Sequence, residues 1–341
     1  MDNFMIYEDS DTQIRFSELS QIYDFILSKN NVFIIIDEIV NKLYFNNFND
    51  VNKYIIHSSE SNKSLETFSG CISELSKLKA DKDITVIGIG GGIVCDIAGF
   101  VAGIYKRGTN LVLIPTTLLA QVDAAIGGKN AINFDNTKNM IGTFKKPLEI
   151  IINVDFLQSL DDDEFINGMA EVVKIACVYD IELFEILENT EPHKLKNHKD
   201  LNLQIISISV KNKMEIVKLD FYDSGIRRIL NFGHTTGHAI EAAYGLSHGK
   251  SVAIGISIAA NTSLKYKLIS KLKYVRINNL LSKFGFDTSF KYNSEKLMYY
   301  ILQDKKISSG FVNEILLKDI GKYEFMKISP ENFRSLLNDL H

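Results

Sequence analysis

The sequence has little cysteine, little proline and no tryptophan: its 341 residues include three cysteines and four prolines. The cysteines are Cys71, Cys95 and Cys177, which lie far apart and form no CxxC pair. This spacing argues against a thiolate zinc site and against a CxxC redox motif. An odd number of widely spaced cysteines is instead typical of buried thiols in a reducing compartment.

The sequence also lacks an excess of positive charge and long apolar runs. Lysine and arginine number 38 and aspartate and glutamate 42, which gives a formal net charge of −4. This balance argues against a nucleic-acid-binding protein that neutralises phosphates. No apolar run approaches the roughly 18 residues of a membrane helix, and the acidic start MDNFMIYEDSD lacks the pattern of a signal peptide. We therefore expect a cytoplasmic protein with neither a nucleic-acid nor a membrane partner.

The remaining composition is that of a globular protein, with 45% hydrophobic and 23% charged residues. In the first 160 residues, short runs rich in β-branched residues alternate with helical patterns. The strand candidates are Val32–Asp37, Lys53–Ile56, Ile84–Gly90, Leu111–Pro115 and Glu149–Val154. Apolar runs of this length indicate strands buried on both faces, and the segments between them are long enough for helical crossovers. We predict an α/β fold that begins with a doubly wound parallel-sheet domain over residues 1–160.

After Leu160 the strand pattern thins out and helical periodicity dominates. Ser159 and the four acidic residues that follow Leu160 favour a helix start there, because carboxylates stabilise the positive end of a helix dipole. We predict a mostly α-helical second domain over residues 161–341.

Three consecutive glycines, Gly90, Gly91 and Gly92, follow a predicted strand and open a predicted helix. Glycines in this position allow a tight turn and a close approach of backbone N–H groups to a phosphate. The pattern is not GxGxxG, because Ile93 stands where the last glycine would fall. The alternative is a tight turn without a ligand, although three glycines cost backbone entropy that such a turn does not require.

Polar and basic residues gather in two further segments. Asp123, Lys129 and Asn130 are followed by Lys138 and Asn139, all on segments punctuated by glycine after a predicted strand. Basic groups in such a place suit an anionic substrate, phosphate especially. A second group, Lys213, Arg227 and Arg228 ahead of Asn231, suits recognition of a carboxylate. The alternative for both segments is a solvated, charged surface.

Three of the seven histidines lie within fifteen residues. His234 and His238 are four residues apart, on one face of a predicted helix, and His248 follows ten residues later. Upstream, Glu171 and Lys174 share one face of an otherwise apolar helix. Imidazoles with one carboxylate and an open position are typical of a catalytic zinc site. The spacing leaves open which three ligands are used among the three histidines and Glu171 or Glu241, and the alternative is a buried structural histidine.

Taken together, the motifs resemble those of the 3-dehydroquinate synthases, within the sugar phosphate cyclase superfamily. They occur in order from about residue 30 to 325: GGGIVCDIAGF, YKRG, IPTTLLAQVDAAIGGKNAIN, KNMIGTF, NGMAEVVK and LNFGHTTGHAIEAAYG. The resemblance implies a dinucleotide-binding α/β domain and a helical metal-binding domain. It implies conversion of 3-deoxy-D-arabino-heptulosonate 7-phosphate to 3-dehydroquinate and phosphate, by transient NAD oxidation, phosphate elimination, re-reduction and intramolecular aldol closure.

Carried over position by position, the resemblance also implies the site residues. The ligands of one divalent metal, zinc or cobalt, would be Glu171, His234 and His248. The residues that bind NAD would be Asp37, Glu60, Lys63, Gly90, Gly91, Gly92, Asp96, Thr116, Thr117, Lys129 and Lys138. The residues that meet the substrate would be Asp123, Lys129, Asn139, Lys174, Lys213, Arg227, Asn231, His238 and Lys306 (or Lys305). Arg107, in YKRG, would reach the phosphate from a neighbouring subunit, which implies a homodimer.

One departure from the family pattern lies beside a predicted ligand: Lys250 stands where the family usually has glutamate after His-Gly. A lysine near a dication is unfavourable unless it points away or pairs with an acid, so metal affinity is the property in question.

Three other functions are alternatives to this synthase activity. A sibling cyclase such as 2-deoxy-scyllo-inosose synthase would act on a neutral sugar phosphate, and a dehydrogenase related to glycerol dehydrogenase would release NADH. An inactive relative would serve only as a binding module.

Overall fold

The computed structural model describes residues 4–8, 11–48, 51–135, 137–303, 307–308 and 310–339. The chain divides into two compact units. Unit 1 comprises residues 1–161 and 199–214, and unit 2 comprises residues 162–198 and 215–341. Sequence reasoning gives one boundary near residue 160, whereas the structure also assigns residues 199–214 to the first unit. Within the described residues, no helix is long and apolar enough to cross a membrane.

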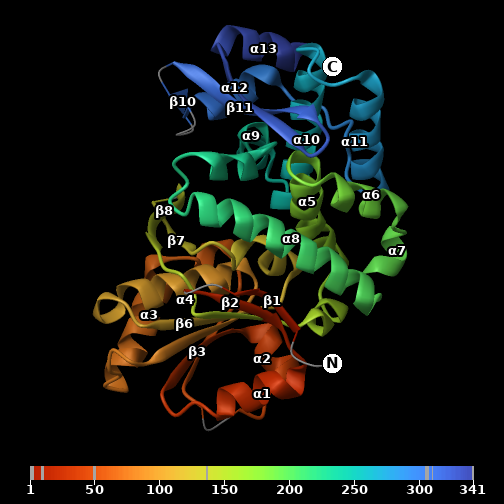
Figure 1. Cartoon of the computed structure of the whole chain (residues 1–341). Coiled ribbons are helices and arrows are strands. Elements are labelled where there is room, and N and C mark those ends of the chain that lie inside the picture. The colour runs from red at the N-terminus through yellow and green to blue at the C-terminus, as the bar shows by residue number, and fades with distance from the viewer. Residues whose placement is uncertain are drawn as a thin grey trace. The chain divides into compact units, whose positions relative to one another are not determined.

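Unit 1 is built on a seven-stranded sheet with the order β1-β2-β9-β6-β5-β3-β4 (Figure 1). The strands are β1 (Phe4–Glu8), β2 (Gln13–Phe16), β3 (Val32–Asp37), β4 (Lys53–Ile56), β5 (Thr85–Gly90), β6 (Asn110–Pro115) and β9 (Glu149–Ile152). All neighbouring pairs are parallel except β1 with β2. The predicted parallel sheet is confirmed, and β1 and β2 were not among the predicted strands.

Helices cover both faces of this sheet, as the doubly wound prediction requires. Ile22 and Ile26 of α1 (Leu19–Leu27) join one core cluster with alternate residues of β3 and β5. Helix α2 (Glu38–Tyr44) lies on this side too, whereas α3 (Leu65–Lys77) and α4 (Gly92–Ile104) lie over the opposite face (Figure 1). Gly88 of β5 lets α4 approach closely, because a Cβ there would lie 2.6 Å from Ala98 Cβ.

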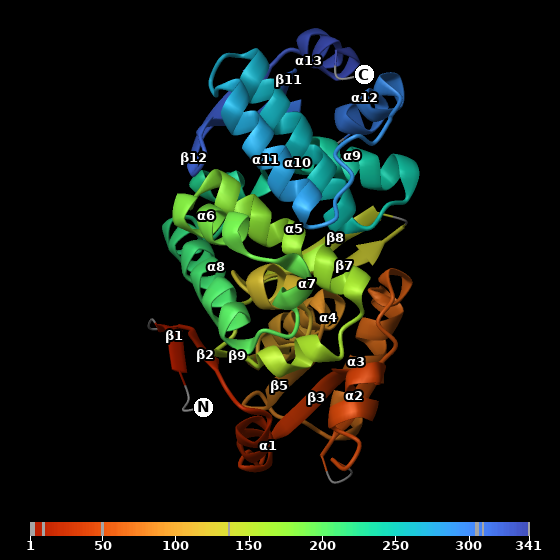
Figure 2. The same ribbon diagram turned by 90° about the vertical axis from the view of Figure 1, so that its right-hand side faces the viewer.

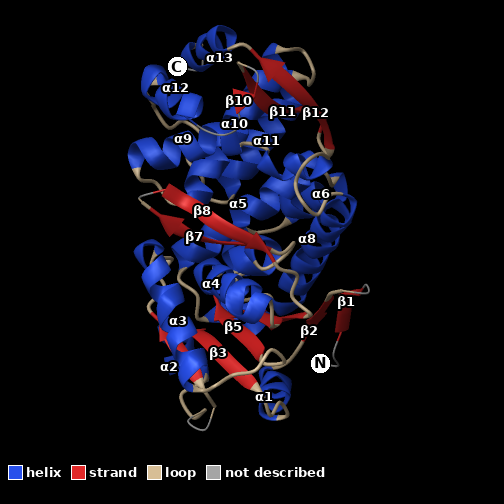
Figure 3. Ribbon diagram, turned by 90° about the vertical axis from the view of Figure 1, so that its left-hand side faces the viewer, coloured by secondary structure: helices blue, strands red, loops and turns tan. Residues whose placement is uncertain are grey.

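The other elements of unit 1 are not part of this sheet. Strands β7 (Lys129–Phe134) and β8 (Thr137–Phe144) pair as a separate antiparallel hairpin (Figure 3). The short helical turns are η1 (Glu60–Asn62), η2 (Tyr105–Arg107), η3 (Ala120–Ala124) and η4 (Val154–Gln158). Helix α8 (Lys199–Leu219) begins in unit 1 and ends in unit 2.

Unit 2 is mostly helical, as predicted. Its helices are α5 (Asp162–Val178), α6 (Ile181–Asn189), α7 (Pro192–Leu195), η5 (Ile226–Asn231), α9 (His234–Tyr244), α10 (His248–Lys265), α11 (Lys271–Lys283), α12 (Ser294–Gln303) and α13 (Pro330–Asn338). Helix α10 contacts α5, α9 and α11 (Figure 2). The unit also contains a three-stranded antiparallel sheet of β10 (Ile307–Ser308), β11 (Phe311–Asp319) and β12 (Lys322–Ile328), which sequence reasoning did not identify.

Candidate functional site

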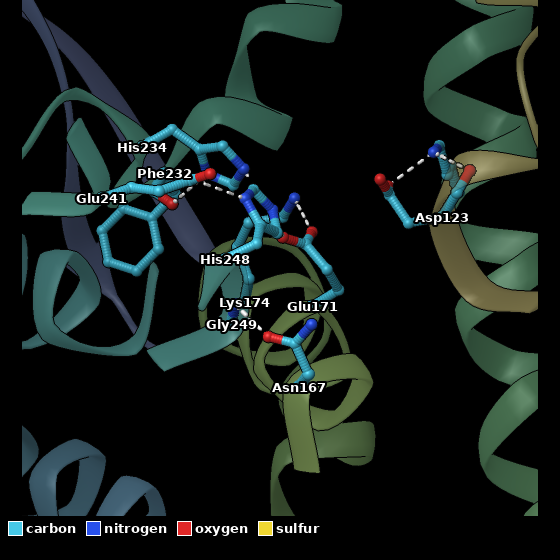
Figure 4. A network of polar contacts seen from close by, with 10 residues as sticks. Asp123, Asn167, Glu171, Lys174, Phe232, His234, Glu241, His248 and Gly249 are labelled. Atoms are coloured by element: carbon cyan, nitrogen blue, oxygen red, sulfur yellow. Dashed lines mark hydrogen bonds and ion pairs between the residues drawn. The ribbon is translucent and has the colours of Figure 1, made fainter. Parts of the chain in front are cut away.

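Unit 2 brings together one carboxylate and two imidazoles from three helices. Glu171 of α5, His234 of α9 and His248 of α10 each offer one ligand atom, and these atoms lie within 4.8 Å of one another. Glu171 Oε1 lies 3.5 Å from His234 Nε2 and 3.3 Å from His248 Nε2 (Figure 4). One oxygen and two imidazole nitrogens that converge on one point form a donor set suited to zinc or cobalt, with room for a further ligand.

The second nitrogen of each imidazole has its own partner. His234 Nδ1 lies 3.2 Å from the carbonyl oxygen of Phe232, and His248 Nδ1 lies 3.2 Å from Glu241 Oε2 (Figure 4). When Nδ1 donates to these oxygens, the lone pair of Nε2 faces the ligand position. The histidine spacing left Glu241 as an alternative ligand. In the structure Glu241 instead contacts Nδ1 of His248, and Nε2 of the same ring lies near Glu171. His238 is exposed, and its ring centroid lies 5.1 Å from that of His234.

The buried charges of this cluster shift the pKa of all three candidate ligands. Burial alone would raise the pKa of Glu171, but the Lys174 ammonium and the neighbouring imidazoles hold it well below its ordinary value. Burial, together with the Lys174 charge, lowers the pKa of His234. Burial opposes the charged form of His248 as well, but Glu171 and Glu241 raise its pKa overall. Lys174 Nζ contacts Glu171 Oε2, so the ammonium offsets the buried carboxylate charge.

Close helix packing places these side chains. Helix α9 begins after Gly233, whose φ of +74° is a left-handed conformation that favours glycine. Gly255 of α10 lies against this turn, because a Cβ there would be 1.9 Å from the Gly233 carbonyl oxygen. Helix α5 is buried on nearly every side, which sets Glu171 in the interior of the unit.

The predicted carboxylate-binding residues Arg227 and Asn231 lie on η5, in the same unit. Arg227 is buried, and its Nη1 donates to the carbonyl oxygen of Phe221 at 2.5 Å. The preceding loop is held by Asp220, whose carboxylate accepts hydrogen bonds from the backbone N–H groups of Ser224, Gly225 and Arg227. This loop therefore fixes the start of the turn that carries Arg227.

In unit 1, the three glycines form the turn from β5 into α4, as predicted. Gly90 ends the strand, Gly91 precedes the helix without a side-chain cap, and Gly92 begins it. The first N–H groups of α4 are therefore available to an anion. Thr116 and Thr117 follow β6 beside this turn: Thr116 N donates to the Gly90 carbonyl oxygen, and a Cβ on Gly91 would lie 3.0 Å from Thr117 Cγ2.

A buried lysine joins several predicted NAD and substrate residues in unit 1. Lys63 Nζ contacts the Asp96 carboxylate of α4, and it donates to Asn139 Oδ1 of β8 at 2.5 Å. Burial raises the pKa of Asp96, although the Lys63 charge opposes this shift. Asn133 of β7 donates to Glu60 Oε1 at 2.7 Å and accepts from Asn139 N at 2.9 Å. One network therefore connects Glu60, Lys63, Asp96 and Asn139.

A second pair in unit 1 joins two predicted substrate residues. Lys213, in the part of α8 that belongs to this unit, donates to both Asp123 Oδ1 and the Asp123 carbonyl oxygen at 2.5 Å (Figure 4). Lys213 is buried, and Asp123 lies on η3. The pairing fixes the ammonium at the end of η3.

The other predicted residues are placed as follows. Asp37 ends β3, and its side chain accepts from Val40 N at the start of α2. Lys129 begins β7 and Lys138 lies on β8, both exposed. Arg107 is exposed on η2 with a φ of +65°. Lys305 and Lys306 lie outside the described residues.

Sequence reasoning did not single out two asparagines that organise these clusters. Asn133 links η1 to the β7–β8 hairpin. Asn167 of α5 is buried and contacts the backbone N–H of Gly249 in α10. Asn167 precedes Glu171 by four residues, so its position on the same helix face could have been identified, whereas the sequence carries no signal for the partners of Asn133.

Comparisons with known proteins identify relatives along most of the chain. Residues 53–167 match the model of the 3-dehydroquinate synthase N-terminal family, and residues 168–307 match that of the C-terminal family. The 3-dehydroquinate synthase of Thermoanaerobacter pseudethanolicus is 37% identical over 334 residues, which cover 94% of each protein.

Two solved structures share the fold. The 2-epi-5-epi-valiolone synthase of Streptomyces hygroscopicus, solved with NAD+ and Zn2+, has a TM-score of 0.87 at 25% identity and covers 98% of this chain and 97% of its own. A 2-deoxy-scyllo-inosose synthase, solved with carbaglucose-6-phosphate, NAD+ and Co2+, has a TM-score of 0.85 at 23% identity and covers 99% of each chain.

Proposed function

The chain belongs to the 3-dehydroquinate synthase family, and we propose that it carries out this reaction at a divalent metal held by Glu171, His234 and His248. The reaction converts 3-deoxy-D-arabino-heptulosonate 7-phosphate to 3-dehydroquinate and phosphate in the shikimate pathway. The observation that carries the proposal is the convergence of these three ligand atoms in a chain whose relatives have this activity.

The described residues fit both cofactors that the solved relatives contain. The carboxylate and the two oriented imidazoles suit zinc or cobalt. The uncapped start of α4, behind the glycine turn, suits the pyrophosphate of NAD. The metal would acidify a substrate hydroxyl, and NAD would accept and return a hydride. We assign NAD binding to residues 1–160 and metal binding to residues 161–341, as the sequence predicts.

The basic residues of the chain would bind and orient the anionic groups of the substrate. We assign the phosphate to Lys129, Asn139 and Arg107, by charge-assisted hydrogen bonds. Lys213 and Arg227, with Asn231, would bind the carboxylate, because both cations are buried and fixed by contacts with oxygen atoms. The remaining substrate contacts would come from Asp123, Lys174 and His238 and from Lys306.

The NAD residues would act mainly by positioning. Lys63 and Asp96 belong to one hydrogen-bonded network with Glu60, so the segment after β4 and the start of α4 are held together. Asp37, Thr116, Thr117 and Lys138 complete the proposed set.

The first experiment is phosphate release from 3-deoxy-D-arabino-heptulosonate 7-phosphate by the purified protein, with catalytic NAD and zinc, before and after chelation. We expect metal-dependent release, a product that dehydratase converts, and no net NADH. No release by protein that binds both metal and NAD would contradict the proposal.

His248→Ala should lower the rate of phosphate release in this assay at least about a thousandfold, because one imidazole ligand is lost.

A second candidate is a sibling cyclase such as 2-deoxy-scyllo-inosose synthase, a structure of which with carbaglucose-6-phosphate shares this fold. The buried cations Lys213 and Arg227 favour a substrate that carries a carboxylate over a sugar phosphate without one. The same phosphate assay with glucose 6-phosphate distinguishes the two. Release from glucose 6-phosphate alone would favour the sibling activity, and accumulation of NADH would favour a dehydrogenase.

We also propose a homodimer in the cytoplasm. The exposed position of Arg107 would allow it to reach the site of a second subunit. The three cysteines are free and buried, which suits a reducing compartment. Sedimentation of the purified protein tests the dimer, and a monomeric enzyme with full activity would contradict the role of Arg107.

A further inference from the structure

We infer that Asn167 is a positioning residue of the metal centre, which fixes the first turn of α10 against α5 and thereby sets the place of His248 relative to Glu171. The inference deepens the proposed function and rests on its metal centre. Glu171 and His248 belong to different helices, so the distance between their ligand atoms depends on how these two helices are joined.

Three consecutive residues of α10 meet three residues of α5 that are spaced by four. His248 Nε2 lies 3.3 Å from Glu171 Oε1, the Gly249 N–H donates to Asn167 Oδ1, and Lys250 Nζ lies 3.2 Å from Asp163 Oδ1. Residues four apart lie on one face of a helix, so Asp163, Asn167 and Glu171 form one stripe along α5. Contacts with this stripe determine where the first turn of α10 lies along α5.

The contact between Gly249 and Asn167 leaves no room for a side chain at position 249. A Cβ on Gly249 would lie 2.3 Å from the Asn167 carbonyl oxygen and 2.6 Å from its Oδ1, so only glycine permits this approach. Ser247, which precedes α10, makes no side-chain cap, and the Gly249 N–H is bound by Asn167 instead. Asn167 and Gly249 are both buried, so no water would replace the Asn167 side chain at low cost. Figure 4 shows Asn167 and Gly249 beside Glu171 and His248.

The contact between Lys250 and Asp163 explains how the chain accommodates a lysine two residues after His248. Its side chain is 48% exposed and pairs with Asp163, which is 77% exposed, so its charge is solvated and partly offset by a carboxylate. An exposed pair of this kind contributes little to stability. The contact of Asn167 with Gly249, and not the Lys250 pair, therefore fixes the first turn of α10 against α5.

The test measures zinc affinity by competition with a chromophoric chelator, on purified protein without substrate. We expect Asn167→Ala to weaken zinc binding at least about tenfold, as is usual when a group that orients a metal ligand is lost. Asn167→Asp keeps an oxygen that can accept from Gly249 N–H, so it should weaken zinc binding less than Asn167→Ala does. Gly249→Ala keeps all three ligands and Asn167 but pushes the helices apart, so it should weaken zinc binding as well.

Two controls separate positioning from general loss of structure. Ser329→Ala removes the cap of α13, a helix without a metal ligand, and should lower thermal stability without changing zinc affinity. Lys250→Glu should leave zinc affinity within about threefold of the wild type, since the side chain pairs outward.

The outcomes that overturn the inference are distinct from those that overturn the proposed function. Wild-type zinc affinity in both Asn167→Ala and Gly249→Ala would contradict the role of Asn167 while leaving the metal centre intact. A larger effect of Lys250→Glu than of Asn167→Ala would assign the positioning to the Lys250 pair instead. Absence of zinc binding by the wild type would overturn the metal centre and the inference together.

Discussion

At the scale of single residues, Asn133 makes hydrogen bonds to Glu60, Lys63 and Asn139. Its amide nitrogen donates to the Glu60 side chain and backbone, its Oδ1 accepts from Asn139 N, and its own backbone N–H donates to the Lys63 carbonyl oxygen. Asn139 has a φ of +53°, a left-handed conformation that costs energy for most residues. Asn133 therefore holds both Asn139 and the segment after β4 in place.

We expect Asn133→Ala to weaken NAD binding about five- to tenfold, because losing these hydrogen bonds costs on the order of 1 kcal/mol or more. Calorimetric titration of the metal-loaded protein with NAD measures the effect. Asn31→Ala is the matched control, since the Asn31 side chain donates an exposed hydrogen bond to Asp81, outside the network. Equal NAD affinity in the two variants would contradict the role of Asn133.

At the scale of elements, the loop before η5 depends on one carboxylate. The backbone hydrogen bonds that Asp220 accepts from Ser224, Gly225 and Arg227 lower its pKa to about 2, although partial burial opposes the shift. A carboxyl whose pKa falls on folding adds stability above its unfolded pKa of about 3.9. That contribution disappears as the pH falls through about 2. The loop is therefore held in place at neutral pH.

We expect Asp220→Asn to lower the stability of the protein by a constant amount between pH 5 and 8, and by progressively less below about pH 4, as Asp220 of the wild type becomes protonated. Denaturant unfolding of both proteins across this range measures the difference. Because Arg227 begins its turn in this loop, KM for the substrate should rise more than kcat falls. A difference in stability that grows as the pH falls would contradict the assignment.

At the scale of the whole molecule, the two units divide the chemistry of the proposed reaction. The glycine turn and the Lys63 network lie in unit 1, and the three candidate metal ligands lie in unit 2. Each unit has a hydrophobic core cluster of its own. A ligand that binds one folded unit stabilises that unit directly, by mass action.

We expect zinc to raise the thermal midpoint of the metal-free protein by several degrees, because binding at a hundred times the dissociation constant adds about 2.7 kcal/mol. Differential scanning calorimetry, with and without zinc, measures the shift. His234→Ala should show none, since one of three ligands is missing. A full shift in His234→Ala would assign the stabilising zinc to another site.

The parallel sheet, the glycine turn and the candidate ligands could all be predicted from the sequence. These features depend on local patterns: apolar runs for buried strands, glycines between a strand and a helix, and histidines four residues apart on one helix. Resemblance to a family then reduced several possible ligand sets to Glu171, His234 and His248. Strands β11 and β12 were missed, because their pattern competes with the helical periodicity of the second half.

The way in which distant segments meet could not be predicted from local patterns and is seen in the folded chain. The tertiary structure assigned residues 199–214, and with them Lys213, to the first unit. It placed Glu241 at Nδ1 of His248, and Lys250 beside Asp163, away from the candidate ligands. It also gave Asn133 and Asn167 their partners. These outcomes have one cause. The local sequence determines which face of its helix or strand a side chain occupies, whereas packing between elements determines which atoms that face contacts.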